Sequence, residues 1–390
     1  MPAPALLPRF RGRLHDPRTA TVVGRLLGLA ILVCFLTGVI SHYLQEPPTW
    51  LSPHLPTRPA SGYRVTQGLH VISGIAAVPL LLVKLWTVYP RLFEWPPVRS
   101  VAHALERLTI AVLVAATLLE LFMGLLNTIQ WYAWPFSFRE VHWALAWVII
   151  GSLLLHLAVK TPVILANWRR MPAERTESPE SSEFPEFREP ELRDEVDRRS
   201  LLLGLGTAVG AVTLFTAGQS VTPLKDLALL APRDPDVGPQ GLPVNRTARA
   251  AGITDDAIRD WRLRVEGPDP YELTLDELRA MPQHRVELPI ACVEGWSKSA
   301  HWEGVRIKDL LARAGLPDGA RLRIVSLQRR GGYGVTEMDH PYTRDDLTLL
   351  ALRLNGDTLA PDHGYPARII APNRPGVLQT KWVTKLEVLT

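Results

Sequence analysis

The chain has 390 residues, which is long enough for two or more domains. Apolar residues make up 47% of it, but they concentrate in the first 165 residues and in 200–219, and the rest has the composition of a soluble domain. The net charge of +4 gives little support to a nucleic-acid partner, and we expect none, because much of the basic charge flanks apolar segments. Two cysteines, Cys34 and Cys292, are too few for a disulfide scaffold or a Cys-rich zinc or iron–sulfur site.

Five segments are apolar enough to cross a membrane, which takes about 20 mainly apolar residues. They are residues 22–43, 66–89, 102–126, 140–165 and 200–219. We expect the first four to form an all-α transmembrane helical bundle within a domain of residues 1–170, and the fifth to be an anchor helix at 200–220. A cleavable signal peptide explains the first segment poorly, because four more follow it.

Basic residues near these segments predict the orientation of the chain. The connections on one side carry most of them: Arg9, Arg11, Arg13, Arg18, Lys84, Arg91, Arg99, Lys160, Arg169 and Arg170. The opposite connections, 44–65 and 127–139, carry Arg58, Arg64 and Arg139. Because basic residues stay in the cytoplasm, we expect a cytoplasmic N-terminus in the cell (inner) membrane. With five crossings, the remaining domain of residues 221–390 lies on the periplasmic or extracellular side.

The connection at residues 171–199 has ten acidic residues and four prolines, which predicts a disordered cytoplasmic linker. It ends in Arg198 and Arg199, followed by Ser200 and three leucines. This pattern resembles a twin-arginine export signal placed inside the chain. A domain that folds around a cofactor made in the cytoplasm would need such a route. The alternative is that the two arginines only add to the positive charge on the cytoplasmic side.

Ionisable residues inside membrane spans are costly and mark candidate functional sites. His142 and His156 share the fourth segment and are 14 residues apart. Fourteen helical steps return the side chain to within about 40° of the same face, about 21 Å further along. Matching the depth of the other segments gives two predicted pairs, His70 with His142 and His103 with His156, with His42 in reserve for the outer pair. This spacing predicts two stacked haems; the alternative is histidines that only form hydrogen bonds at the membrane surface.

With its histidines so placed, the region of about residues 20–170 resembles the four-helix cytochrome b-type membrane domains of bacterial respiratory enzymes. The resemblance implies two b-type haems and exchange of electrons with quinone or quinol. Glu120, inside the third segment, is either a proton or quinone contact or a buried hydrogen-bonded acid.

Residues 221–390 alternate short β-rich runs with turn signals and a few helical patterns, which predicts an α+β domain. The predicted strands are 261–267, 284–295, 320–328, 367–372 and 381–389. The predicted helices are 274–281, 307–315 and 345–356. A lone cysteine such as Cys292 is usually a small core residue, and the alternatives are a nucleophile or a metal ligand.

Two stretches of this domain carry a specific resemblance. CVEGWSKSAHWEGVRIKDLL, which begins at Cys292, resembles the molybdenum-ligating segment of the sulfite oxidase family. LNGDTLAPDHGYPARIIAPNRPGVLQTKWVTKLEV resembles that family's pterin-binding end. The match covers about residues 240–390. It implies a sulfite-oxidase-type fold with a molybdopterin cofactor, in which the Cys292 thiolate binds molybdenum and the cofactor contacts are Asn245, Ser326, His363, Arg368, Gln379, Thr380 and Lys381.

Residues just after the cysteine are candidates for the substrate pocket. We predict that Lys298 and His301 line it and contribute to catalysis, while Trp296 and Trp302 are either pocket or core aromatics. The segment lacks the arginine-rich run that animal sulfite oxidases use near the sulfite anion, and we expect no equivalent of their C-terminal sandwich. Bacterial relatives include periplasmic methionine sulfoxide reductases that are served by a separate haem membrane subunit, and this chain looks like a fusion of the two parts.

The sequence therefore predicts a membrane-bound molybdopterin oxidoreductase that couples oxygen-atom transfer on a small substrate to the quinone pool through b-type haems. Reduction of a sulfoxide-type substrate is favoured, and a sulfite-type dehydrogenase that donates electrons to quinone is the alternative. A further alternative is a non-catalytic binding or sensing module on a membrane anchor.

Overall fold

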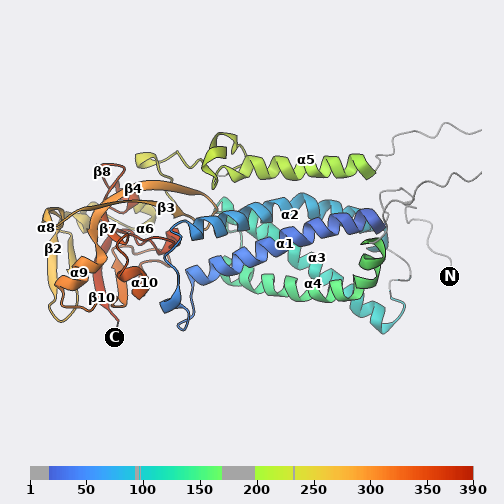
Figure 1. Ribbon diagram of the computed structural model, residues 1–390, viewed down its shortest axis with the longest axis horizontal. Helices are drawn as coiled ribbons and strands as arrows, with labels where there is room; N and C mark the ends of the chain where they lie inside the picture. The colour runs from blue at the N-terminus through green and yellow to red at the C-terminus, as the bar shows by residue number, and fades with distance from the viewer. Residues whose placement is uncertain (1–16, 93–95, 97, 169–197, 232, 390) are drawn as a thin grey trace, which may run out of the picture. The chain divides into compact units, whose positions relative to one another are not determined.

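The computed structural model describes residues 17–92, 96, 98–168, 198–231 and 233–389 (Figure 1). These residues group into two compact units. The first unit takes the described parts of Met1–Leu32, Ser73–Asn127 and Trp131–Thr213, and the second those of Val33–Ile72, Thr128–Gln130 and Leu214–Thr390. The predicted linker 171–199 lies outside the described residues, apart from Arg198 and Arg199. The other domain bounds stay predictions.

Five long helices carry the apolar segments. They are α1 (Pro17–Gln45), α2 (Gly62–Leu92), α3 (Val101–Thr128), α4 (Phe138–Trp168) and α5 (Arg198–Ala217). Each is long and apolar enough to cross a membrane, which confirms the five predicted segments. Large apolar side chains such as Leu29, Leu36 and Leu154 are exposed on them. Helices that are apolar on every side are typical of contact with lipid, where each backbone group must be satisfied within the helix.

Within the first unit, α1, α2 and α5 share one apolar cluster. Val23 and Leu27 of α1 meet Leu80 of α2 and Leu205 of α5. Leu121 of α3 is partly buried against the same cluster. Figure 1 shows these helices running along one another.

The second unit contains one mixed sheet and one antiparallel sheet. Their strands are β1 (Arg262–Val265), β2 (Tyr271–Thr274), β3 (His284–Ala291), β4 (Ser297–Arg306), β5 (Leu322–Ser326), β6 (Val335–Met338), β7 (Leu349–Leu354), β8 (Asp357–Thr358), β9 (Arg368–Ile370) and β10 (Val383–Val388). One sheet has the order β2-β1-β10-β5-β6, in which β1 and β10 are parallel. The other has the order β3-β4-β7-β8, and β9 also pairs with β7. The five predicted strands are confirmed, with shorter bounds.

Short helices lie before β1 or between the strands. They are α6 (Ala248–Ala251), α7 (Asp255–Arg259), α8 (Leu275–Ala280), α9 (Ile307–Arg313) and α10 (His340–Thr343), with 3-10 turns at Ser52–His54, Thr222–Leu227, Pro239–Gly241, Pro361–His363 and Gly376–Leu378. Thr274 and Glu277 cap α8 reciprocally, which fixes its start. The predicted helices 274–281 and 307–315 are confirmed as α8 and α9.

The predicted helix 345–356 is wrong, because Leu349–Leu354 forms β7. This strand pairs with β4 on one side and with β8 and β9 on the other, and most of its side chains are buried. A strand covered on both faces is apolar at successive positions, and so it lacks the alternation that separates strands from helices.

The main core of the second unit includes side chains that precede the sheets by some 200 residues. Leu44, Leu55 and Tyr63 belong to the same buried cluster as Trp261 and Ile369. Tyr63 is 1% exposed, and its backbone N–H donates to Oδ1 of Asn373 at 2.6 Å. The C-terminal end of α1, the start of α2 and the connection between them are therefore part of the folded body that carries the sheets.

Candidate active site

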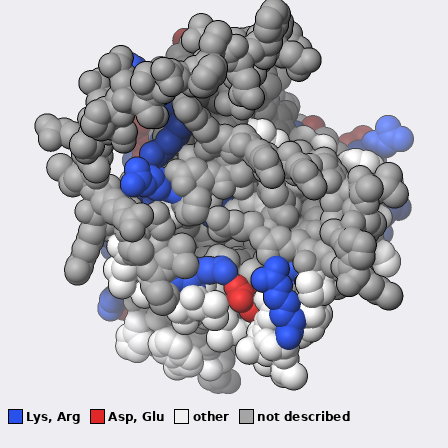
Figure 2. Space-filling model, turned by 90° about the vertical axis from the view of Figure 1, so that its right-hand side faces the viewer, with Lys and Arg blue, Asp and Glu red and all other residues white. Residues whose placement is uncertain are grey.

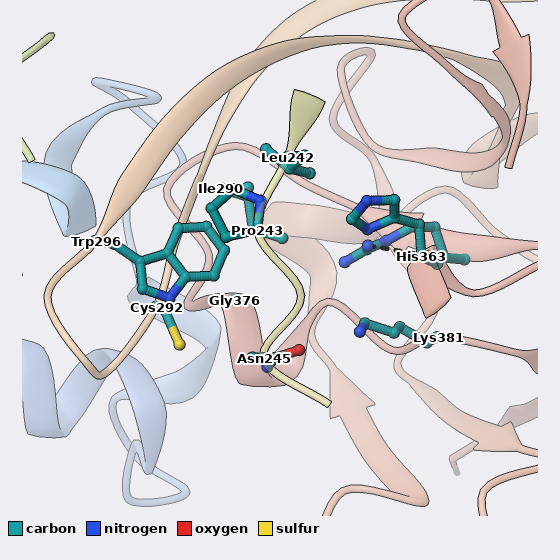
Figure 3. Close-up of a pocket in the computed structure, with 10 residues that line it drawn as sticks. Leu242, Pro243, Asn245, Ile290, Cys292, Trp296, His363, Gly376 and Lys381 are labelled. Atoms are coloured by element: carbon teal, nitrogen blue, oxygen red, sulfur yellow. Dashed lines mark hydrogen bonds between the residues drawn. The ribbon is translucent and has the colours of Figure 1, made fainter. Parts of the chain in front are cut away.

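A cleft in the second unit brings together residues from both predicted motifs. It has about 290 Å³ of space not filled by protein atoms. Its lining residues are Leu242, Pro243, Asn245, Ile290, Cys292, Trp296, His363, Arg368, Gly376 and Lys381. Figure 3 shows Cys292 and Trp296 on one side, His363 and Lys381 on the other, and Asn245 between them. Five of the predicted site residues thus meet in one place: Asn245, Cys292, His363, Arg368 and Lys381.

Cys292 directly follows β3 and begins a tight turn that leads into β4. The N–H of Cys292 donates to the carbonyl of Trp296 at 2.9 Å, and the carbonyl of Cys292 accepts from the N–H of Gly295 at 3.1 Å. Gly295 has a φ of 103°, and a Cβ there would lie 3.0 Å from a methyl of Val71. The turn therefore requires glycine at this position.

The Cys292 side chain is 2% exposed. Burial, and then the nearby Glu294 carboxylate, raise the pKa of its thiol well above the ordinary value. A protonated thiol is a poor nucleophile, whereas a bound metal ion displaces the proton and stabilises the thiolate. This environment favours a metal ligand over a free catalytic nucleophile.

Two cations lie on the opposite side of the cleft without acidic partners. The Arg368 guanidinium, in a residue 1% exposed, donates to the carbonyls of His363 at 3.0 Å and Gln379 at 3.2 Å. The Lys381 ammonium donates to the carbonyls of Arg246 at 2.9 Å and Asp362 at 2.8 Å. Among the described residues, no carboxylate forms an ion pair with either. Buried charge is costly unless it is paired, so this pair of cations fits a bound anion.

The electrostatics of the same residues agree with this interpretation. Burial lowers the pKa of Arg368 to about 9 and that of Lys381 to about 7, where the Arg368 charge adds to the effect. Burial and Arg368 also lower the pKa of His363 to about 4. His363 is therefore neutral at pH 7, and its Nε2–H donates to the carbonyl of Pro239 at 2.7 Å. Gly364, with a φ of 107°, lets this loop turn where a Cβ would lie 2.9 Å from that of Lys381.

Three other predicted cofactor contacts lie behind the lining. Ser326 Oγ donates to the carbonyl of Lys381 at 2.6 Å. Gln379 bridges the backbone of Ala371 and Arg374, and Thr380 Oγ1 lies 2.6 Å from Thr336 Oγ1. Their side chains hold the loop that leads from β9, which begins at Arg368, to Lys381.

The residues predicted to act on substrate are placed differently. Lys298 forms an ion pair with Asp236, and the His301 side chain is exposed on β4. Neither is among the residues that line the cleft. Of the two tryptophans, Trp296 lines the cleft, while Trp302 is fully buried beneath the Arg368 guanidinium. The predicted catalytic roles of Lys298 and His301 stay predictions.

The structure adds charged residues that the sequence did not single out. Glu294 is 3% exposed, and its Oε2 accepts from Arg233 Nε at 2.7 Å and from Trp296 Nε1 at 3.1 Å. Near Lys381, the Nε of Arg246 is buried without a hydrogen-bond partner in the part of the chain that is described. An acid two residues after the cysteine was a visible signal for Glu294. The orphaned donor of Arg246 is a further sign that an anion fits this side of the cleft.

The predicted haem ligands have different hydrogen bonds. His70 Nδ1 lies 2.8 Å from the carbonyl of Cys34, and His142 Nδ1 lies 3.1 Å from Oε1 of Glu120. A histidine that donates from Nδ1 presents an unprotonated Nε2, which suits iron. His103 differs, because its Nδ1 accepts from the N–H of Arg99 at 3.2 Å. His42 contacts the ring of Tyr43 edge-on. The predicted pairing of the histidines stays a prediction.

Comparison with known proteins addresses the second unit. Residues 250–390 match the family model described as the oxidoreductase molybdopterin binding domain. This part of the chain is similar to molybdopterin oxidoreductase domains. The donor set fits that cofactor, because a soft thiolate would hold the metal and the cations a phosphate.

Three curated relatives illustrate the similarity. The mitochondrial sulfite oxidase of Drosophila melanogaster is 30% identical over 161 residues, which are 33% of this chain and 27% of the relative. The uncharacterized oxidoreductase YuiH of Bacillus subtilis is 28% identical over 33% of this chain and 64% of its own. The catalytic subunit of the protein-methionine-sulfoxide reductase MsrP of Xanthomonas campestris pv. campestris is 30% identical over 33% and 45%. The chain thus spans less than two thirds of each.

Proposed function

We propose that the protein is a membrane-bound oxidoreductase that transfers an oxygen atom to or from a small substrate. It would exchange the electrons of this reaction with the quinone pool through b-type haems. The observation that supports it most directly is the cleft, where a buried cysteine faces two cations that form no ion pair with any described carboxylate. Bound molybdopterin would supply the two-electron chemistry at its metal. The protein would hold it by the Cys292 thiolate, by Asn245 and His363, and by Arg368 and Lys381 at the phosphate end.

Reduction of a neutral, sulfoxide-type substrate is favoured over oxidation of sulfite. A dianion such as sulfite needs uncompensated positive charge next to the metal. The guanidinium of Arg233, which approaches the Cys292 turn, is already paired with Glu294. Lys381 and His363 lie on the far side of the cleft from the cysteine (Figure 3), and Arg368 is held there by the carbonyl of His363. Sulfite oxidation remains the second candidate, supported by the sulfite oxidase among the relatives.

We further propose that α1–α4 form a four-helix bundle that holds two b-type haems, and that the cleft faces the periplasm. Donation from Nδ1 of His70 supports the outer haem. The Glu120 carboxylate, whose Oε1 lies 3.1 Å from Nδ1 of His142, would then orient His142 rather than bind quinone. Figure 2 shows described Lys and Arg side chains at the end of the first unit where α1 and α5 begin. Their charge supports a cytoplasmic position for that end.

Metal analysis of the purified full-length protein tests the proposal. Made in a host that synthesises molybdopterin, the wild type should contain about one molybdenum per chain. Cys292→Ser should lose most of it, and Cys34→Ser, which changes the other thiol, should retain it. A wild-type protein without molybdenum would contradict the proposal and favour a binding module. Two turnover assays would then decide the direction of the reaction. One measures reduction of a sulfoxide by a reduced dye, and the other measures oxidation of sulfite by an oxidised dye.

A further inference from the structure

The turn that begins at Cys292 is held by side chains from far earlier in the chain. Gln67, in the first turns of α2 and 6% exposed, donates from Nε2 to the carbonyl of Val293 at 2.9 Å. Val71, one helical turn further along α2, faces Gly295 closely enough to exclude a Cβ there. All of these residues belong to the second unit. The residue next to the cysteine is therefore tethered by a buried amide.

A second amide acts on the other side of the same turn. Gln130, which has a φ of 58° in the connection between α3 and α4, donates from Nε2 to Oε1 of Glu294 and accepts from Arg233 Nη2 at 2.7 Å. Arg233 in turn binds Glu294 at 2.7 Å. Gln130, Arg233 and Glu294 form a closed ring of hydrogen bonds, which we call the Glu294 ring. In such a ring the orientation of each member depends on the other two.

These contacts place the two glutamines where a small shift of the turn would move the Cys292 sulfur. A metal–thiolate bond fixes the sulfur position to a few tenths of an ångström, and the residues that orient a ligand contribute strongly to metal binding. Gln67 acts on the first residue after Cys292, and Gln130 on the second. Both precede residues 250–390, the stretch that matches the molybdopterin domain family.

We propose that Gln67 and Gln130 are positioning residues, which fix the Cys292 sulfur by holding the Val293 carbonyl and the Glu294 carboxylate. Their role in the metal-bound protein rests on the proposed function. In the cofactor-free protein, the same hydrogen bonds keep Cys292 buried.

The first experiment uses the full-length protein made in a host that lacks molybdopterin synthesis. The alkylation rates of Cys292 and Cys34 by a maleimide are followed separately by peptide mass spectrometry. Gln67→Met and Gln130→Met each remove the amide and keep the chain length. Loss of one buried hydrogen bond should raise the Cys292 rate about 5-fold to 100-fold through easier local opening. The Cys34 rate should not change.

Matched controls remove hydrogen bonds that do not reach the turn. Thr66→Val, beside Gln67, loses bonds to Ser41 and Tyr63. Tyr132→Phe, near Gln130, loses the bond to Asn127. Both should keep the wild-type rate at Cys292. Equal rates in wild type and the glutamine variants would overturn the proposal, as would a parallel rise at both cysteines, which signals general loosening.

The second experiment uses protein loaded with molybdenum. The glutamine variants should show displaced lines in the electron paramagnetic resonance spectrum of the one-electron-reduced metal, and about 10-fold to 100-fold weaker retention of it during dialysis. Unchanged lines and retention in both variants would contradict the positioning role. If the wild type binds no molybdenum, the proposed function fails, and the alkylation experiment still decides whether the glutamines hold the turn.

Discussion

Nε of Arg233 lies 2.7 Å from Oε2 of Glu294, two residues after the cysteine that lines the cleft. The acid is 3% exposed at its side chain and the arginine 31%, so the pair is buried on one side only. Breaking a buried ion pair by removing one partner leaves an uncompensated charge, which is the costly outcome.

Glu294→Ala should therefore destabilise the second unit. We expect a loss of about 1–3 kcal/mol, below the value for a fully buried pair because water still reaches Arg233. The apparent Tm of the cofactor-free protein measures it. Glu303→Ala breaks the more exposed pair with Arg353, whose N–O distance is 3.8 Å, and should cost less than about 1 kcal/mol. A larger loss from Glu303→Ala than from Glu294→Ala would contradict this ranking.

Lys381 should make the stability of the cofactor-free protein depend on pH. Its pKa is lowered to about 7 in the folded state, and it is near 10.4 in an unfolded chain. Between these values the unfolded chain binds a proton that the folded protein does not, so stability rises with pH, by at most about 1.4 kcal/mol per pH unit. Urea unfolding at pH 7, 8 and 9 measures the slope. Lys381→Met should flatten it, while Lys385→Met, at an exposed ion pair, should leave it in place.

Binding of an anion in the cleft should reverse this trend. A phosphate beside the ammonium favours the charged lysine and raises its pKa, so Lys381 takes up a proton on binding near pH 8. Metal binding at Cys292 releases the thiol proton at the same time, so the uptake at Lys381 is the difference between wild type and Lys381→Met. Calorimetry of cofactor reconstitution in two buffers of different ionisation enthalpy measures it for both proteins. Equal proton exchange in the two proteins would show that Lys381 does not contact the anion.

If α1–α4 hold haem as proposed, Glu120 should influence the haem without binding it. Its Oε1 lies 3.1 Å from Nδ1 of His142. A partner at Nδ1 orients the ring, and its loss typically weakens metal binding about 10-fold to 100-fold. Glu120→Ala should lower the haem retained after detergent washing, and His142→Ala should abolish one b-type band in the reduced-minus-oxidised spectrum. His54→Ala, at an exposed histidine outside the spans, is the control. Full b-type bands in His142→Ala would remove His142 from the ligands.

Arg198 and Arg199 begin α5 with exposed side chains. If the twin-arginine route exports the folded domain, replacing both by Lys should leave it in the cytoplasm, although the charge is unchanged. Added protease would then fail to cleave residues 221–390 in spheroplasts. Unchanged cleavage would show that the arginines act only through their charge, as the positive-inside rule requires.

The sequence predicted best what short-range patterns determine. Five apolar runs have the length of a membrane span, and α1–α5 follow them closely. The cleft residues Cys292, His363 and Lys381 were found because they belong to contiguous motifs. β7 was missed because a strand buried on both faces has no alternation.

Other features depend on contacts across long stretches of chain. Gln67 and Gln130 look like ordinary polar residues near the ends of membrane helices. Their roles follow from contacts with Val293 and Glu294, more than 160 positions away. A single sequence carries no local signal for such a pairing. Lys298 was expected at the substrate pocket because it is close to Cys292 in sequence, yet β4 carries it to Asp236.

Leu44 at the end of α1, Leu55 in the connection that follows and Tyr63 at the start of α2 all lie in the core beneath the sheets. A soluble enzyme cut out at residue 221 would lack three of its own interior side chains, and it would expose the apolar surface that they cover. Separating the two halves into independent subunits would therefore require new residues to fill that space. The chain before residue 221 and the chain after it therefore share one buried cluster as well as a covalent link, and cleaving the chain would leave that cluster to hold them together.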